Sequence, residues 1–161
     1  MKFHIKVLLL SVLLVACKEQ NQFDIEKGTK EILKVHNLQR DYHFNKDSIS
    51  FANQFSENFV SINNGIISRP KKSETISRYN SYFLSVDFIR WDDVTEPIIL
   101  FSDDGTLAYA IVDKIVKVTY KGETGEKVER ETRFAWTTIY RKYGDEWKID
   151  CVTSTSKPIN S

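Results

Sequence analysis

The stretch RETRFAWTTIYRKYGDEWKIDCVTSTS, residues 130 to 156, predicts the fold more clearly than any other part of the chain. Two runs rich in β-branched and aromatic residues flank a turn that contains Gly144 and Asp145. Both residues accept turn dihedral angles that bulkier side chains resist, so the pattern is typical of a β-hairpin. We therefore expect an antiparallel hairpin at the C-terminal end of the domain.

Length and composition predict a single globular domain. The chain has 161 residues, of which 41% are apolar and 28% are charged, which is enough for one core and an ordinary polar surface. The formal net charge is +1, and loss of Lys2 and Lys6 with the N-terminal segment would bring it near −1. Nucleic-acid binding needs a basic surface, so no nucleic-acid partner is expected.

The N-terminal residues have the features of a bacterial signal peptide. A short basic region precedes an apolar run over residues 7 to 15, which is too short to span a bilayer comfortably as a helix. The segment Leu-Val-Ala-Cys follows at residues 14 to 17. It resembles the bacterial lipobox, in which the cysteine thiol receives a diacylglycerol and becomes the first residue after cleavage. We therefore expect residues 1–16 to be a signal peptide and Cys17 to be lipidated.

Acylation of Cys17 predicts both the location of the protein and its membrane partner. Each buried CH₂ of an acyl chain such as palmitate contributes about 0.8 kcal/mol. Two or three chains would hold the domain to a membrane of the bacterial cell envelope, outside the cytoplasm, with residues 17–23 as lipidated end and tether. The alternatives are a plain secretory signal and an uncleaved anchor in which the cysteine occurs by chance. Cys151 would then have no disulfide partner, and we expect it to be a small buried residue on a strand.

A long amphipathic helix is predicted to follow Asp24, which would be its N-cap. At 100° per residue, Ile32, His36, Gln39 and His43 lie almost on one line, which indicates that they either line a cavity or form a satisfied core network. A histidine in such a position is more often packed than a ligand, and no carboxylate or cysteine completes a metal set. No metal or cofactor is therefore expected.

Two shorter helices are predicted next. Asp47 or Ser48 can cap the first of them. Pro70 suits the first turn of the second, where its missing N–H is no loss. Tyr79 and Phe83 share one face of that helix, an arrangement that is more often core than cofactor site.

The second half of the domain is predicted to be β-structure. In the predicted strand over residues 107 to 120, the first six residues place apolar side chains on both faces, so we expect both faces of this half to be covered. Lys114 and Lys117 indicate that the second half of the strand faces solvent. Helices followed by antiparallel strands predict an α+β domain with helices on one face of a curved sheet. Strands are expected at residues 59–62, 66–67, 88–94, 98–101 and 107–120, and on both sides of the turn at Gly144.

The order of these elements resembles the SnoaL-like branch of the nuclear transport factor 2-like superfamily. The resemblance is carried by Asn45-Lys46-Asp47 after the first helix, by residues 55 to 62, and by residues 138 to 142 and 147 to 149 of the hairpin. It implies a cone-shaped α+β barrel over residues 24–158, in which three N-terminal helices are cupped by a strongly bent, mainly antiparallel sheet. It also implies that a set of residues faces one ligand-binding cavity: Gln39, His43, Asn63, Tyr79, Phe83, Trp136 and Thr153.

The resemblance does not extend to a known catalytic set. Steroid isomerases of the superfamily place a tyrosine eight residues before the position that matches Asp47 and a catalytic aspartate sixteen residues after it. Here these positions hold Gln39 and Asn63. An amide cannot accept a proton near neutral pH, and glutamine is a poorer oxyanion donor than a phenol, so that mechanism is disabled. Many lipoprotein relatives carry a histidine on the last strand at the position of Thr153.

Three kinds of function are consistent with these features. The first is a lipid-anchored binding domain whose cone takes a small, partly apolar molecule without assured catalysis. The second is an acid/base enzyme, an isomerase, lyase or hydrolase, with His36 or His43 as general base. The third is an interaction module that forms a homodimer through its open sheet face, for which an apolar outer stripe would be the sign. A hollow that holds His43 beside Asn63 would favour the first two, and an interior filled by Trp136 and Phe83 would favour the third.

Overall fold

The computed structural model describes residues 23–159. The expected signal peptide, the lipobox cysteine Cys17 and most of the tether lie outside the described residues. Phe23, the last residue of the expected tether, belongs to the folded unit, since its ring centroid lies 5.0 Å from that of Phe101. Within the described residues, no helix is both long and apolar enough to cross a bilayer.

Three helices form where the sequence predicts them. The carboxylate of Asp24 caps the first by accepting a hydrogen bond from the backbone N–H of Lys27 at 2.9 Å. Asp47 caps the second in the same way, with the N–H of Ser50 as donor at 2.9 Å. Pro70 lies just before the third helix and not in its first turn. The helices are α1 (Ile25–Phe44), α2 (Ser48–Asn53) and α3 (Lys72–Ser85).

The strands form one seven-stranded sheet with the order β2-β1-β7-β6-β5-β3, and β4 also pairs with β5. All neighbouring strands are antiparallel except β1 and β7, which are parallel. Gly144, at φ 61°, makes the turn between the last two strands, as the sequence predicts. The strands are β1 (Phe55–Asn63), β2 (Ile66–Ser68), β3 (Asp87–Asp93), β4 (Ile98–Phe101), β5 (Leu107–Lys121), β6 (Lys127–Tyr143) and β7 (Glu146–Pro158).

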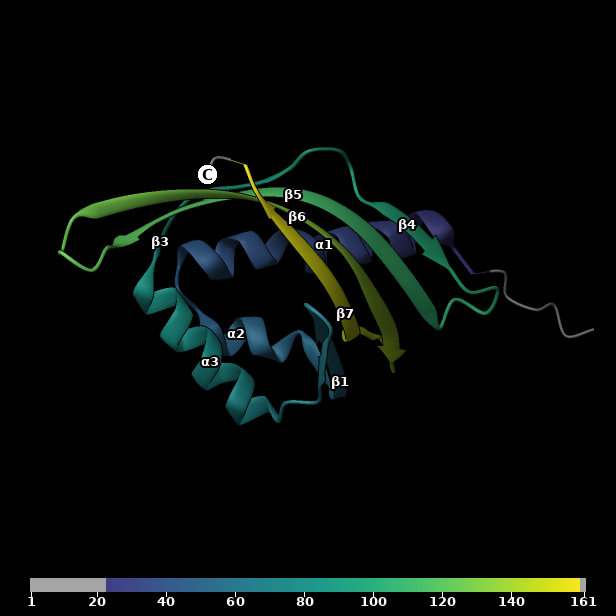
Figure 1. Ribbon diagram of the computed structural model, residues 1–161. Coiled ribbons are helices and arrows are strands. Elements are labelled where there is room, and N and C mark those ends of the chain that lie inside the picture. Colours follow the sequence, from purple (N-terminus) through teal and green to yellow (C-terminus); the bar gives the residue numbers. More distant parts are fainter. Residues whose placement is uncertain (1–22, 160–161) are drawn as a thin grey trace, which may run out of the picture.

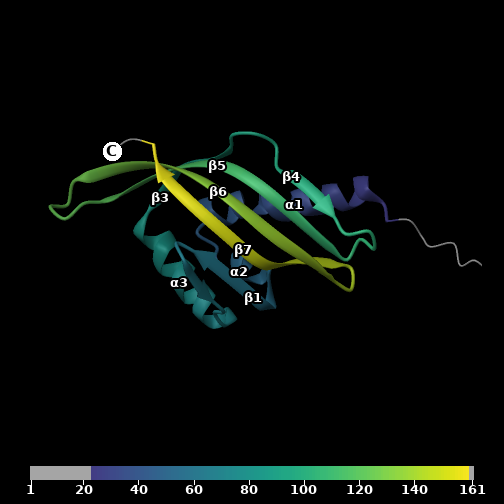
Figure 2. The same cartoon turned by 45° about the vertical axis from the view of Figure 1, so that its right-hand side comes forward.

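The sheet curves strongly around the helices. Strands β5, β6 and β7 arch over α1, which lies against their concave side, while α2 and α3 lie farther from the arch (Figure 1). In the turned view, the three long strands run side by side across the molecule, with α3 and β1 below them (Figure 2). The structure confirms a cone-shaped α+β fold in which a bent, mainly antiparallel sheet cups three helices.

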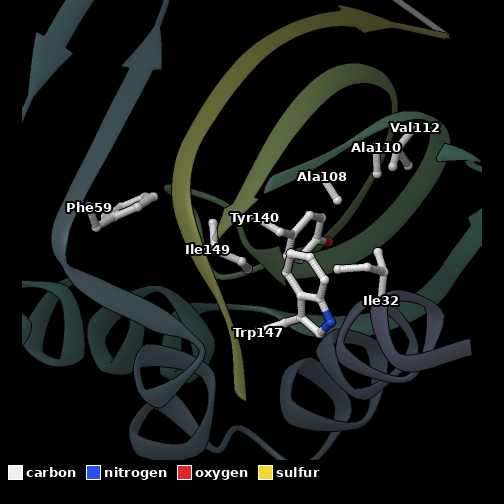
Figure 3. Close-up of a cluster of buried hydrophobic side chains, with 8 residues drawn as sticks. All are labelled: Ile32, Phe59, Ala108, Ala110, Val112, Tyr140, Trp147 and Ile149. Atoms are coloured by element: carbon white, nitrogen blue, oxygen red, sulfur yellow. The ribbon is translucent and has the colours of Figure 1, made fainter. Parts of the chain in front are cut away.

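The larger core cluster joins α1 to the sheet. The rings of Tyr140 and Trp147 lie next to Ile32 of α1, and Ala108 supplies a small side chain opposite Tyr140 (Figure 3). Burying a large apolar side chain stabilises the fold by about 1.5–3 kcal/mol. The indole N–H of Trp147 also donates a hydrogen bond to the carboxylate of Glu31 at 3.0 Å. These contacts fix the distance between α1 and the concave face.

A second cluster lies where the end of α3 meets β3 and β5. Its three valines are buried, whereas the aromatic side chains around them are only partly buried. The concave face is therefore less completely covered here than at the larger cluster. The valines are Val86, Val116 and Val118, and the aromatic residues are Tyr82, Phe88, Trp91, Tyr120 and Phe134.

A bulge in β7 decides which face its later side chains take. Tyr140 pairs with Ile149, and Ile139 pairs with Cys151, so Asp150 is an extra residue on β7. The alternation of side chains shifts by one position at such a bulge. Cys151 consequently lies on the outer face beside Ile139 and is half-buried, not buried inside as the sequence suggested.

Candidate functional site

One line of α1 faces the concave side of the sheet. Ile32, His36, Gln39 and His43 are all buried, as their helical spacing predicts. Both histidines make hydrogen bonds within the protein. The line is buried in the interior, but it is not the fully satisfied core network that was one of its two interpretations, because Nδ1 of His36 has no hydrogen-bond partner among residues 23–159.

The ring of His43 is packed among aromatic side chains. The closest is Trp91, with 3.8 Å between ring centroids. Three phenylalanines lie at 4.8–5.1 Å. His43 is therefore a member of the core, in a cluster that we call the aromatic nest. The phenylalanines are Phe51, Phe83 and Phe88.

Burial lowers the pKa of His43 to about 4, because the charged imidazolium would lose its hydration. The hydrogen bond that Nδ1–H donates to the carbonyl of Gln39, 2.6 Å away, opposes this shift. The positive charge of Lys114 adds to it. The ring is thus neutral at pH 7, and the surrounding side chains separate it from solvent.

A buried charged network lies beside the aromatic nest. Asp93, the last residue of β3, places Oδ2 at 2.9 Å from His36 Nε2 and Oδ1 at 2.7 Å from Lys114 Nζ. The exposed fractions of the three side chains are 25% for Asp93, 2% for His36 and 3% for Lys114. An ionised carboxylate can only accept, so the proton of a neutral His36 ring lies on Nε2. Asp93 thereby orients the imidazole, as a carboxylate does in many acid/base sites.

The burial of Lys114 corrects the expectation that it marks a solvent-facing part of its strand. Lys114 points into the concave side, opposite Phe134 of β6. Lys117 does lie on the outer face, partly exposed and paired with Glu129 at 2.6 Å. A lysine is rarely buried unless a carboxylate partners it, and Asp93 is that partner here.

Burial and pairing have opposite effects on the ionisable groups of the network. Burial acts to raise the pKa of Asp93, but the hydrogen bonds from His36 and Lys114 outweigh it and hold the pKa below its usual value. Burial lowers the pKa of Lys114, and the bond to Asp93 offsets this only in part. A buried ion pair is weak evidence for stability. Perturbed charged groups on a concave face are instead candidates for a functional site.

Two buried polar atoms next to the network have no hydrogen-bond partner among residues 23–159. They are Nδ1 of His36 and the indole Nε1 of Trp91. Lys114 Nζ lies 5.5 Å from the centroid of the Trp91 ring, so these groups are close together. An unpaired buried polar atom costs about 1–3 kcal/mol. Each of these atoms is therefore a position where a water molecule or a ligand atom would be stabilised.

Aromatic rings on the concave face border this network. Trp136 lies 6.4 Å from Trp91 and 6.4 Å from Phe134 between ring centroids, and all three are only partly buried. Trp136 pairs with Ser154 of β7, which pairs in turn with Asn63 of β1. These three side chains form a row across the concave face. The partly exposed rings of Trp91, Phe134 and Trp136 thus lie beside the almost completely buried side chains of His36 and Lys114.

The residues expected to face one cavity are divided among three places. Thr153 pairs with Thr137 on the outer face of the sheet, because the bulge at Asp150 shifts the alternation of β7. Two others belong to the concave row: Asn63 and Trp136. The remaining four belong to the aromatic nest or its edge: Gln39, His43, Tyr79 and Phe83.

Four residues of the site were not selected from the sequence: Trp91, Asp93, Lys114 and Phe134. A signal for Lys114 is present, because it lies between Val112 and Val116 at the even-numbered positions of a strand. Strand side chains alternate between faces, so these three positions share the buried face. Trp91 and Asp93 are likewise two residues apart on β3.

Two hollows in the surface lie away from this network. One, of about 420 Å³, follows the exposed side of α1 between Asp24 and Lys34. The other, of about 360 Å³, lies where the end of α2 and the start of β1 meet the start of α3, with Phe55, Phe59 and Thr75 in its wall. Neither contains a residue of the network. No group of three or more His, Cys, Asp or Glu side chains in the described part of the chain could hold a metal ion.

No protein-family model matches the sequence, and no curated protein matches it. Solved structures do match. A conserved protein from Planctomyces limnophilus has a TM-score of 0.71 at 18% identity, over 83% of this chain and 99% of that one. A nuclear transport factor 2-like protein from Cytophaga hutchinsonii has a TM-score of 0.60 at 15% identity, over 80% and 98%.

A third solved structure is a proposed dehydratase of the nuclear transport factor 2-like family from Streptomyces avermitilis. Its TM-score is 0.64 at 10% identity, over 84% of this chain and 99% of that one. At such identities the likeness concerns the fold and not the activity. The chain therefore has the nuclear transport factor 2-like fold.

Proposed function

We propose that the protein binds a small, partly apolar molecule on the concave face of its cone. Trp136 and Phe134 would contact its apolar part, and the network of His36, Asp93 and Lys114 would contact its polar end. Binding sites for small molecules typically combine apolar walls with a few convergent polar groups. The observation that carries the proposal is the pair of unpaired buried polar atoms beside aromatic rings that solvent reaches.

Catalysis is not part of this proposal. The lowered pKa of His43, about 4, makes its ring a weak base, and the ring is packed in the aromatic nest away from solvent; both points argue against it as a general base. Gln39 and Asn63 occupy the positions where steroid isomerases have a tyrosine and an aspartate. His36 has an orienting carboxylate in Asp93, but its side chain is almost completely buried.

A fluorescence titration tests the binding site. The neutral probe N-phenyl-1-naphthylamine, added to the chain from residue 21 onward, is expected to bind with increased fluorescence. Trp136→Ala should weaken binding about tenfold or more, since an aromatic contact and its buried area together contribute more than about 1.4 kcal/mol. Tyr109→Ala is the matched control, because it removes an aromatic ring from the outer face. Equal binding by wild type and Trp136→Ala would contradict the proposed position of the site.

We also propose that the domain is held to a membrane of the bacterial cell envelope, outside the cytoplasm, through acylated Cys17. The support is the Leu-Val-Ala-Cys segment after the short apolar run. Metabolic labelling with a palmitate analogue should label the wild type and not Cys17→Ser, and only the wild type should stay with the membrane fraction. Cys151→Ser is the control and should be labelled like the wild type. Equal labelling of Cys17→Ser would contradict this anchor.

A second candidate function is pairing of two copies through the outer sheet face, and an outer apolar patch favours it. The five side chains of this patch are exposed by 39–57% and are neighbours across three strands. Ion pairs flank them, Asp113 with Arg133 on one side and Arg141 with Asp150 on the other. An apolar centre with a charged rim is typical of a protein interface. The patch consists of Ile98, Leu100, Tyr109, Ile111 and Ile139.

Sedimentation velocity tests the pairing. The chain from residue 21 onward is expected to sediment as a dimer, and Ile111→Glu, at the centre of the outer apolar patch, as a monomer. Ile49→Glu is the control, because Ile49 is 59% exposed on α2, away from the patch. A monomeric wild type at all concentrations would exclude a stable dimer.

A further inference from the structure

We infer that the ligand of the concave face carries a carboxylate, whose oxygens lie against Lys114, on an apolar body that lies against Phe134 and Trp136. This inference rests on the proposed binding function and adds the chemical class of the ligand.

Hydrogen-bond donors exceed free acceptors at this place. The ammonium group of Lys114 has three N–H donors, and its only ion-pair partner among residues 23–159 is Asp93. The indole N–H of Trp91 is a further donor without a partner. Both oxygens of Asp93 are already engaged, one by His36 and one by Lys114, which leaves Nδ1 of His36 as a single free acceptor against these several free donors. A ligand that accepts hydrogen bonds therefore satisfies more of these groups than one that donates them.

The register of the sheet places the N–H donors of Lys114 and Trp91 beside the aromatic rings that an apolar ligand would contact. Phe134 is the direct cross-strand partner of Lys114, and neighbouring strands lie about 4.7–4.9 Å apart. Trp136 follows Phe134 on the same face. A planar apolar group over these two rings would therefore hold a carboxylate on its edge close to Lys114 Nζ.

The surrounding charges favour a negative group over a positive one. Arg40 of α1 adds a second positive charge near Lys114. Asp92 and Asp93 are the nearby negative groups, and both already form ion pairs, Asp92 with Arg90 and Asp93 with Lys114. A cationic ligand would meet the buried ammonium of Lys114 with no free carboxylate to pair with. A charge-assisted bond from Lys114 to a ligand carboxylate is, in contrast, among the stronger hydrogen bonds that proteins make.

Calorimetric titration with a matched pair of probes tests this inference. The probes are 2-naphthoate and 2-naphthamide, which share one apolar body and differ in charge. The full chain is held in lipid nanodiscs, and empty nanodiscs serve as the blank. Wild type should bind 2-naphthoate at least about tenfold more tightly than 2-naphthamide, a difference of about 1.4 kcal/mol, because hydrogen bonds to a charged group are stronger than those to a neutral one. Because this ratio is measured in the wild type, it does not depend on whether a variant folds.

Two variants test whether Lys114 causes the difference in affinity between the two probes. Lys114→Met keeps the length and apolar stem of the side chain and should bring the two affinities within about twofold. Lys117→Met, three residues nearer the C-terminus and on the outer face, should keep the wild-type ratio. Equal affinities in the wild type, or an unchanged ratio in folded Lys114→Met, would overturn the inference while leaving the binding site in place. Failure of both probes to bind would overturn the inference together with the proposed function.

Discussion

Burial of its ring makes the stability contribution of His43 depend on pH. The pKa of His43 is lowered to about 4 in the folded protein, against 6.5 in the unfolded chain. Between these values the unfolded chain binds a proton that the folded protein does not, so stability rises with pH. This contribution is complete above pH 6.5 and is lost as the pH falls toward 4.

The free energy of unfolding should therefore decrease by about 2 kcal/mol between pH 7 and pH 5, before most carboxylates titrate. His43→Phe should remove this decrease, because phenylalanine fits an aromatic neighbourhood and does not ionise. It should lower stability at pH 7 by only about 1 kcal/mol, the usual contribution of one hydrogen bond. Urea unfolding at both pH values measures the two effects. An equal decrease in the variant would assign the pH dependence to other groups.

Asp93 responds to pH in a lower range. Its pKa is held below the usual value, so its stabilising contribution is present above the unfolded pKa of about 3.9 and is lost as the pH falls through the folded pKa. Asp93→Asn removes the negative charge and leaves Lys114 buried without a counter-ion. We expect it to lower the free energy of unfolding at pH 7 by about 2–3 kcal/mol, less than for a fully buried pair because Asp93 is partly exposed.

Chemical unfolding of Asp93→Asn at pH 7 measures this loss. Asp113→Asn is the matched control, because Asp113 pairs with Arg133 on the solvent-exposed outer face. Exposed pairs contribute little, so the control should unfold nearly as the wild type does. Similar losses of unfolding free energy in the two variants would show that the ion pair of Asp93 contributes no more to stability than the exposed pair of Asp113.

The single residues of the site were only partly predictable from the sequence. The line through Ile32, His36 and His43 follows from helical periodicity, which is a local property. The partnership of Lys114 with Asp93 depends on how β3 aligns with β5, and that register includes a shift between Phe88 and Arg90. No local pattern reports this shift, so the pairing of Lys114 with Asp93 could not be predicted. The alternation of Lys114 with Val112 and Val116 does indicate burial, but it conflicts with the usual exposure of lysine.

At the scale of elements, caps and turns were predictable and the bulge was not. Asp24 and Asp47 act through hydrogen bonds to near neighbours, and Gly144 acts through its own positive φ, so the sequence shows these effects directly. The bulge at Asp150 depends on the neighbouring strand. Without the bulge, the side chains of residues 151 and 153 would point into the cone, as those of Trp147 and Ile149 do. The placement of Thr153 inside the cone was wrong for this reason.

Asp150 holds the bulge through side-chain hydrogen bonds. Its carboxylate accepts from Arg141 Nε at 2.7 Å and from the hydroxyl of Tyr143 at 2.9 Å. Asp150→Ala should therefore lower the free energy of unfolding by about 1–2 kcal/mol. Asp145→Ala, in the exposed turn of the same hairpin, is the control and should change stability little. Unfolding curves in urea measure both, and an unaffected Asp150→Ala would show that the backbone holds the bulge by itself.

At the scale of the whole molecule, the sheet separates two surfaces. Its concave face carries the charged network and its aromatic border, and its outer face carries the outer apolar patch. The order of helices and strands, together with the hairpin at Gly144, predicted this architecture because each element has its own periodicity. The filled aromatic nest around His43 was not predictable, since it joins residues of α1, α2, α3 and β3 that are far apart in sequence.

The two surfaces should act independently. Ile111→Glu, which is expected to separate a dimer, should bind N-phenyl-1-naphthylamine with an affinity within about twofold of the wild type, because Ile111 faces away from the concave side. The fluorescence titration described for Trp136→Ala measures this. Loss of probe binding in a folded Ile111→Glu would show that the site needs the second copy.

The most direct test of the concave-face site is a nuclear magnetic resonance titration that follows the three tryptophan indole N–H signals. Trp91 and Trp136 lie at the proposed site, whereas the N–H of Trp147 is bonded to Glu31 in the core and serves as an internal reference. Adding 2-naphthoate should shift the signals of Trp91 and Trp136 and leave that of Trp147 in place. Unchanged signals from Trp91 and Trp136 at saturating probe would contradict the account.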